Sequence, residues 1–201
     1  MGAAATRVAS RTVGGMAELQ YPMPPLADTV VLLRPWRTED VPGKLMAFGD
    51  PLVQQFAWSR TTAYTEADAR DYFVEQETAR RAGHALTVAV ADPRDEATIL
   101  GGASLYDVDR ETERAGIGYW LAPEARGRGA ATHTVRLLAG WAFSALGMKR
   151  ITLTCGPDND ASQRVAGRCG FVREGVLRSD VVFKGGRRDS VVFSLLPGEL
   201  R

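Results

Sequence analysis

A glycine-rich turn lies immediately before a predicted helix, and its residue types suit the binding of phosphate groups. The turn reads Arg126-Gly127-Arg128-Gly129-Ala130-Ala131. The first N–H groups of a helix have no partner within the helix, and the helix dipole makes that end positive. Glycine lets the backbone approach a ligand, and arginine adds positive charge. In isolation the pattern also fits an ordinary solvated turn, so its surroundings must decide between the two.

Two other phosphate-binding motifs fit this turn poorly. A P-loop requires Gly-x-x-x-x-Gly-Lys, which the chain lacks. A dinucleotide-binding turn needs a third glycine where Thr132 stands, and it needs an acidic residue at the end of the next strand, where 151–155 has none. Both nucleotide folds are therefore disfavoured.

The histidines and cysteines form no recognisable catalytic or metal-binding set. His84 and His133 lack a Cys, Ser or carboxylate at a spacing typical of a triad or metal site. Cys155 and Cys169 form neither a Cys-x-x-Cys motif nor a disulfide framework. We therefore expect no metal, and a reducing cytoplasm as the setting.

Composition predicts one enzyme-sized domain. The chain has 201 residues, 45% of them hydrophobic, and its 25 basic residues nearly balance 24 acidic ones. It has no basic patch for nucleic acid and no apolar run long enough to span a bilayer. We expect a flexible tail and Pro-rich linker at 1–25, whose first 15 residues stand before a second methionine, Met16, and a domain at 26–201.

The turn must be held by a sheet flanked by helices. Apolar and β-branched runs predict strands at 29–34, 85–91, 98–106, 114–121, 151–155, 171–178 and 190–196. Capping residues and helical apolar spacing predict helices at about 38–48, 65–82, 129–146 and 159–168. This order predicts a mixed sheet of the α+β (mixed α/β) class. Gly116 and Gly118 leave a gap on strand 114–121, in which we expect a ligand.

With its flanks, the turn resembles the acyl-coenzyme A motif of the GNAT superfamily of N-acetyltransferases. The resemblance rests on Gly118-Tyr119-Trp120-Leu121-x-Pro123-Glu124-x-Arg126-Gly127-x-Gly129-x-Ala131-Thr132. Leu33-Arg34-Pro35, Asn159-x-x-Ser162-x-x-Val165 and Cys169-Gly170-Phe171 make the chain similar to the ribosomal-protein N-terminal acetyltransferase (RimJ/RimL-like) branch. The resemblance covers residues 28–197 approximately.

The resemblance implies a mostly antiparallel sheet of six to seven strands, with strands 114–121 and 150–155 splayed apart. Acetyl-CoA is the implied co-substrate, with pantetheine along strand 114–121 and the pyrophosphate on the amides of the turn. The helix beginning at Asn159 packs near the thiol. The implied cofactor-binding residues are Tyr119, Trp120, Leu121, Arg126, Gly127, Arg128, Gly129, Ala130, Ala131, Thr132 and Asn159.

The resemblance also implies catalytic roles for Leu121 and Ser162. A backbone N–H near Leu121 polarises the thioester carbonyl, and Ser162 replaces the acidic tyrosine of other branches, whose position is Ala166 here. Ser162 also suits a purely structural first-turn role. The branch often carries a glutamate base where this chain has Gly116. Turn carboxylates (Asp107, Glu111 and Glu113) acting through water are weak substitutes, and a low-pKa amine needs little help.

The implied reaction is transfer of acetyl from acetyl-CoA to a primary amine, a protein N-terminus or a small molecule, by direct attack in a ternary complex. An alternative is a catalytically impaired acyl-CoA sensor or regulator, supported only by Gly116. A structural module is suggested only by the apolar closing strands, which leave a homodimer open. The acceptor pocket belongs to 36–84, where the aromatic residues Trp36, Trp58 and Phe56 either line it or pack in the core.

Overall fold

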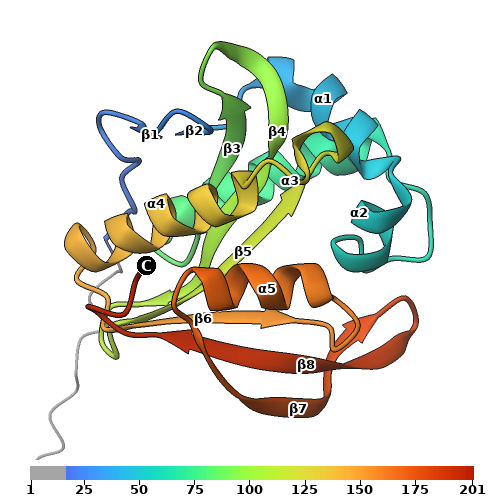
Figure 1. Ribbon diagram of the computed structural model, residues 1–201. Helices are drawn as coiled ribbons and strands as arrows, with labels where there is room; N and C mark the ends of the chain where they lie inside the picture. The colour runs from blue at the N-terminus through green and yellow to red at the C-terminus, as the bar shows by residue number, and fades with distance from the viewer. Residues whose placement is uncertain (1–16) are drawn as a thin grey trace, which may run out of the picture.

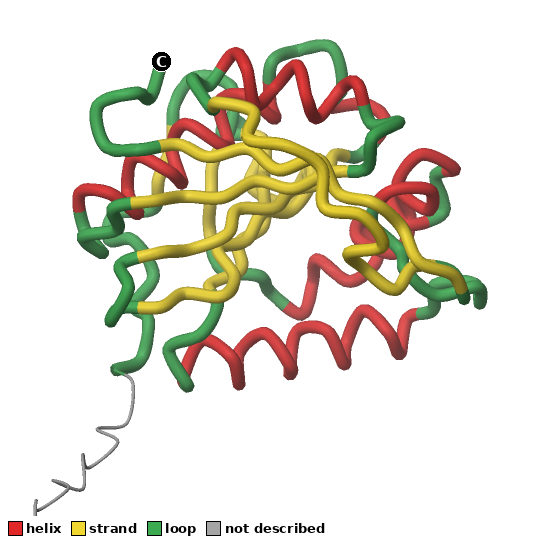
Figure 2. The backbone as a smooth tube through the Cα atoms, turned by 90° about the horizontal axis from the view of Figure 1, so that it is seen from below, coloured by secondary structure: helices red, strands yellow, loops and turns green. Residues whose placement is uncertain are grey.

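A single twisted sheet with helices on both faces forms the body of the protein, in a computed structural model that describes residues 17–201 (Figure 1, Figure 2). The strands are β1 (Leu26–Ala27), β2 (Leu32–Arg34), β3 (Leu86–Asp92), β4 (Asp95–Asp109), β5 (Arg114–Leu121), β6 (Arg150–Cys155), β7 (Val172–Phe183) and β8 (Gly186–Leu195). The α-helices are α1 (Val41–Phe48), α2 (Pro51–Phe56), α3 (Glu66–Arg81), α4 (Ala130–Ser144) and α5 (Asp160–Arg168). Short 3₁₀ turns cover Thr38–Asp40 and Pro123–Ala125.

The sheet is split between its fifth and sixth strands. Its order is β1-β2-β3-β4-β5-β6-β8-β7, and only the β5–β6 pair is parallel. That pairing joins 114–116 to 150–152 and then stops, so the two strands separate toward Leu121. The predicted class and splay are confirmed. The described residues contain eight strands rather than six to seven, because the two-residue β1 forms an extra edge strand that no hydrophobic run in the sequence predicts.

Successive side chains of β5 point to opposite faces of the sheet, and different helices cover the two faces. On β5, Ile117 points into the main core, where it joins residues of α4 such as Val135 and Leu138. Trp120, on the opposite parity, stacks with Trp36 at 6.2 Å between ring centroids. Figure 1 shows α4 and α5 on one face, with α3 behind the sheet. The splay therefore opens between two helical layers.

The gap expected over Gly116 is filled by protein. Tyr106 on β4 pairs with Gly116 on β5, and a Cβ at Gly116 would lie 2.2 Å from the Tyr106 ring. The phenol hydrogen bonds with Thr154 of β6, so the ring crosses β5 and reaches the other half of the sheet. The expectation of a ligand above Gly116 was wrong, because this glycine admits a tyrosine of the same chain.

Leu19 and Tyr21, from the segment assigned to a tail and linker, pack against the core, whereas Met23 of the same segment is exposed. Leu19 is fully buried in the core. Its N–H donates to the Arg80 carbonyl at the end of α3, and its carbonyl accepts a hydrogen bond from the Arg80 guanidinium. The Arg80 guanidinium also lies over the Tyr21 ring, 5.0 Å from its centroid. Packing therefore begins well before Leu26. Residues 1–16, including Met16, lie outside the described residues.

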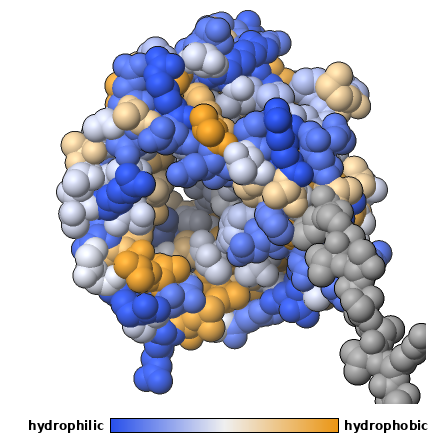
Figure 3. All heavy atoms as spheres, turned by 180° about the vertical axis from the view of Figure 1, so that it is seen from behind, coloured by the Kyte–Doolittle hydropathy of each residue, from blue (hydrophilic) through white to orange (hydrophobic). Residues whose placement is uncertain are grey.

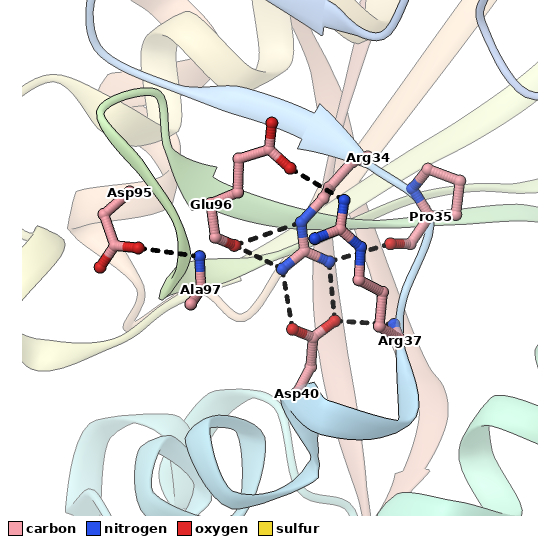
Figure 4. A network of polar contacts seen from close by, with 7 residues as sticks. All are labelled: Arg34, Pro35, Arg37, Asp40, Asp95, Glu96 and Ala97. Atoms are coloured by element: carbon pink, nitrogen blue, oxygen red, sulfur yellow. Dashed lines mark hydrogen bonds and ion pairs between the residues drawn. The ribbon is translucent and has the colours of Figure 1, made fainter.

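A buried ion pair fixes the beginning of α1 (Figure 4). The Arg34 guanidinium makes two 2.8 Å hydrogen bonds to the two carboxylate oxygens of Asp40, and it donates at 2.6 Å to the Glu96 carbonyl. Asp40 also accepts the Arg37 N–H at 2.7 Å. Arg34 and Asp40 are almost completely buried. This network ties β2, β4 and α1 together and thereby sets where the α1 side chains point.

Candidate functional site

The glycine-rich turn has the backbone shape of an open helix start. Gly127 and Gly129 adopt left-handed conformations, with φ of 74° and 82°, which side chains disfavour. Gly129 is the N-cap of α4, and the first intrahelical bond runs from the His133 N–H to its carbonyl at 3.1 Å. The amides of residues 130–132 precede that bond and are free of intrahelical acceptors. This end of α4 can therefore receive an anion through its backbone.

The Arg126 side chain turns away from the helix start and holds the turn in place. Its guanidinium pairs with the Asp50 carboxylate and donates at 3.2 Å to the Leu121 carbonyl. Asp50 in turn caps α2, accepting the N–H groups of Leu52 and Val53 at 3.0 Å each. The Arg126 guanidinium holds the pKa of Asp50 below its usual value. This link between the turn and α2 joins segments 76 residues apart, and no local sequence pattern predicts it.

The backbone of Leu121 faces the splay. Ala122 donates to the Leu100 carbonyl at 2.9 Å, so its N–H points toward β4. Because successive backbone groups point to opposite sides of a strand, the N–H and C=O of Leu121 point toward the opening. Arg126 satisfies the carbonyl, whereas β6 has separated from β5 here and offers the N–H no ladder partner. An N–H in this position can donate to an oxygen that enters the splay.

A phenol and a hydroxyl meet across the splay. Tyr119 Oη and Ser162 Oγ lie 3.2 Å apart, and the Ser162 N–H donates to Asn159 Oδ1 at 3.1 Å. Asn159 is therefore the N-cap of α5, as predicted. Burial raises the pKa of Tyr119 to about 12, so its hydroxyl stays protonated in neutral solution. Cys155, half-buried at the end of β6, hydrogen bonds with Ser162 and has a pKa raised by burial.

Tyr119 was predicted only to lie along pantetheine, and the contact of its hydroxyl with Ser162 was not predicted. Ala166, at the position where other branches carry a tyrosine, is fully buried. The structure supplies a phenol from β5 instead of from α5. Strand parity was the available signal, because Tyr119 lies two residues after Ile117 and so faces the same α4–α5 side. Only the tertiary fold, however, brings residues 43 positions apart together.

A cavity of about 260 Å³ is lined by the Trp120 side chain, on the face of β5 opposite to Tyr119. Its lining comes from α1, α3, the segment after α2, and β5, namely Lys44, Phe48, Ala57, Trp58, Ser59, Arg60, Tyr64, Asp68, Asp71, Tyr72, Glu75 and Trp120. Figure 3 shows that the back face of the molecule is hollowed near its middle. Trp58 lines the cavity, Trp36 supports it by stacking on Trp120, and Phe56 instead packs against Arg188 at 5.2 Å.

The turn carboxylates lie far from this region. Glu113 immediately precedes the first residue of β5, and Leu121 is the last, so at about 3.3 Å per residue the two ends are separated by roughly 25 Å. Asp107 and Glu111 belong to the same distant end.

Residues 17–201 contain no group of three or more His, Cys, Asp or Glu side chains suited to a metal ion. In that part of the chain no helix could cross a membrane.

Comparisons with known proteins agree with this geometry. The sequence profile described as an acetyltransferase (GNAT) domain matches residues 31–172. The uncharacterized N-acetyltransferase p20 of Bacillus licheniformis is 29% identical over 168 residues, covering 83% of this chain and 93% of p20. YdaF of Bacillus subtilis (strain 168), which carries an N-acetyltransferase name, is 35% identical over 104 residues, 52% of this chain. That match spans only 57% of YdaF.

Solved structures share the fold. Mycobacterium smegmatis RimJ in complex with CoA-disulfide superposes with a TM-score of 0.73 at 24% identity, covering 85% of this chain and 83% of RimJ. RimL, a ribosomal L7/L12 alpha-N-protein acetyltransferase in complex with coenzyme A, gives 0.75 at 21% identity, with coverage of 86% and 96%. At these identities the likeness concerns the fold alone.

Proposed function

Because the chain belongs to the acetyltransferase (GNAT) domain family, we propose that it transfers an acetyl group from acetyl-CoA to a primary amine. One observation carries the proposal. The backbone N–H of Leu121 and the Tyr119–Ser162 pair border the same opening, beside a helix start with free amides. The opening thus combines an oxyanion donor, a proton donor and an anion-binding backbone.

Acetyl-CoA fits the donor side. Its pyrophosphate would lie at the start of α4, on the amides of residues 127–132, where the two left-handed glycines keep the backbone uncovered. Pantetheine would lie along Tyr119, Trp120 and Leu121 of β5, where β6 no longer pairs with this strand. Asn159 would orient the end near the sulfur. Arg128 adds charge at the turn, whereas Arg126 contributes chiefly by bracing it against Asp50.

The reaction is a direct attack within a ternary complex. The neutral amine nitrogen attacks the thioester carbon, and the carbonyl oxygen gains negative charge that the Leu121 N–H stabilises. The C–S bond then breaks, and the leaving thiolate takes a proton from the hydroxyl pair formed by Tyr119 and Ser162. The nitrogen, which is cationic after the attack, loses one proton to water, and the hydroxyl pair regains one proton from water, so the products are an N-acetyl amide and free coenzyme A. No covalent enzyme intermediate is needed.

The amine would enter through the cavity beside Trp120. Its walls are aromatic, and Asp71 and Glu75 line it from α3, while Asp68 of the same helix pairs with Arg60. Carboxylates here favour an acceptor that arrives as a protonated amine. A protein N-terminus and a small amine both satisfy this requirement.

The test is release of free thiol from acetyl-CoA in the presence of a panel of amines and N-terminal peptides. Turnover that depends on the amine, with mass spectrometry showing one added acetyl group, supports the proposal. Saturable acetyl-CoA binding without turnover on any acceptor would instead favour the sensor alternative, for which Gly116 no longer argues because Tyr106 explains it.

A further inference from the structure

Lys44 is buried inside a cage of aromatic rings. Its side chain comes from the second turn of α1 and is 1% exposed. Five rings surround its ammonium, with distances from Nζ to the ring centroids of 3.9 Å for Tyr72, 4.5 Å for Phe48, 5.0 Å for Trp120, 5.2 Å for Trp36 and 5.9 Å for Tyr64. The cage opens into the cavity that we assign to the acceptor.

This ammonium has no carboxylate partner. The ion pairs and hydrogen bonds of residues 17–201 include none to the Lys44 side chain, although buried charges are ordinarily paired. Instead, the Lys44 ammonium makes cation–π contacts with the ring faces, which attract a cation but hold it less strongly than a carboxylate does. The chain uses arginine almost everywhere, since only 3 of its 25 basic residues are lysines. A lysine is the one basic side chain of this length that can also become neutral.

We propose that Lys44 accepts the proton that the acceptor amine must lose before it attacks the thioester. The inference rests on the proposed function. Neutral Lys44 takes a proton from the acceptor ammonium, leaving a neutral nucleophile and a Lys44 cation that the rings stabilise. Trp120 connects the two sites, because it precedes Leu121 on β5 and its ring lies against the ammonium. Lys44 thus supplies from α1 the proton acceptor that is missing at Gly116.

The surroundings of Lys44 favour this role. Burial lowers its pKa to about 7, which keeps a substantial neutral fraction at physiological pH. Tyr72 and Tyr64 face it with pKa values raised by burial, so both remain neutral. The other charged groups lining the same cavity are Arg60, Asp68, Asp71 and Glu75. Arg60 and Asp68 pair with each other at 2.8 Å, so they contribute little net charge.

The decisive experiment is the pH dependence of kcat/KM for the wild type, Lys44→Met and Lys44→Arg, with the best amine of the panel. Wild-type kcat/KM should rise with a pKa near 7. Both variants should lose about 100-fold or more at pH 7 while binding acetyl-CoA normally, and their profiles should rise only near the pKa of the free amine. Arginine keeps the charge but cannot give up its proton, so its failure separates proton transfer from charge.

An unchanged profile in Lys44→Met, with kcat/KM within threefold of wild type, would overturn the proposal. A uniform loss without movement of the pH limb would assign Lys44 a structural role instead. If the variants fail to fold, lysine-selective ¹³Cε NMR of the wild type decides, since three lysines give three signals and Lys149→Arg and Lys184→Arg assign two of them. No signal titrating below pH 9 would refute the inference. Failure of the proposed function is distinct, because wild type would then acetylate no amine.

Discussion

At the residue scale, Ser162 has a structural and a chemical environment that can be separated by substitution. Its N–H belongs to the Asn159 cap, whereas its hydroxyl lies beside Tyr119. Ser162→Ala removes the hydroxyl and keeps the backbone bond. We expect kcat to fall about 10- to 100-fold with acetyl-CoA affinity nearly intact, measured by steady-state kinetics and calorimetry. Ser144→Ala, at the exposed end of α4, is the matched control, and equal kcat in the two variants would remove Ser162 from the mechanism.

Gly116 and Gly118 offer a second residue-scale test, because only one of them is crossed by a ring. A Cβ at Gly116 would meet Tyr106 at 2.2 Å, whereas a Cβ at Gly118 would find ordinary contacts from 3.5 Å. Gly116→Ala should therefore lower the free energy of unfolding by about 2–3 kcal/mol, and Gly118→Ala by less than about 1 kcal/mol. Urea denaturation measures both. Equal losses in the free energy of unfolding would mean that the Tyr106 ring can move aside without destabilising the fold.

These residues also mark where sequence reasoning succeeded and where it stopped. The Asn159 cap and the glycine-rich helix start at 126–131 follow from local rules, which depend on a few neighbouring residues. The Lys44 cage and the Tyr119 hydroxyl contact do not, since their partners come from distant segments. Gly116 was interpreted as a missing carboxylate because the sequence does not show that Tyr106 lies opposite it.

At the scale of elements, the placement of α1 depends on the buried Arg34–Asp40 pair. Asp40→Asn keeps the shape but leaves the Arg34 charge without its anion. We expect the free energy of unfolding to drop by about 3 kcal/mol in thermal or urea denaturation, because a buried charge loses its partner. Glu96→Gln is the control, since the Arg37–Glu96 pair is half exposed and its loss should cost under about 1 kcal/mol. A small effect of Asp40→Asn would indicate that water reaches Arg34.

Element boundaries were predictable where periodicity is regular. α3 and α5 begin at the predicted caps Thr65 and Asn159. The last hairpin runs through 172–183 and 186–195, whereas the predicted strands end at 178 and resume only at 190. Ser179 has a positive φ, and the register shifts between Leu177 and Val181. Such irregularities break the alternation on which strand prediction relies. The helix α2 was missed because six residues show no period.

At the scale of the whole molecule, the sheet consists of two halves that pair at the base of the splay and are also joined by the Tyr106 side chain. Acetyl-CoA in the splay would contact both halves, β5 and α4 from one and α5 from the other. A ligand that binds only the folded state stabilises it, by about 2.7 kcal/mol at 100 times its Kd. For a chain of this size we expect Tm to rise by roughly 5–10 °C.

Gly129→Glu should abolish that rise by placing a carboxylate where the pyrophosphate would sit. The substitution also introduces strain, because Gly129 has a φ of 82°. Gly147→Glu is the matched control, since Gly147 has a φ of 72° and free space around it beyond the opposite end of α4. Both variants should lose a similar few degrees of Tm without ligand, about 1–2 kcal/mol each. Thermal denaturation with and without acetyl-CoA should then show the ligand-induced rise in Gly147→Glu but not in Gly129→Glu. If Gly129→Glu retains the rise, the pyrophosphate does not bind at the start of α4, and the two halves of the sheet must be joined by the ligand elsewhere.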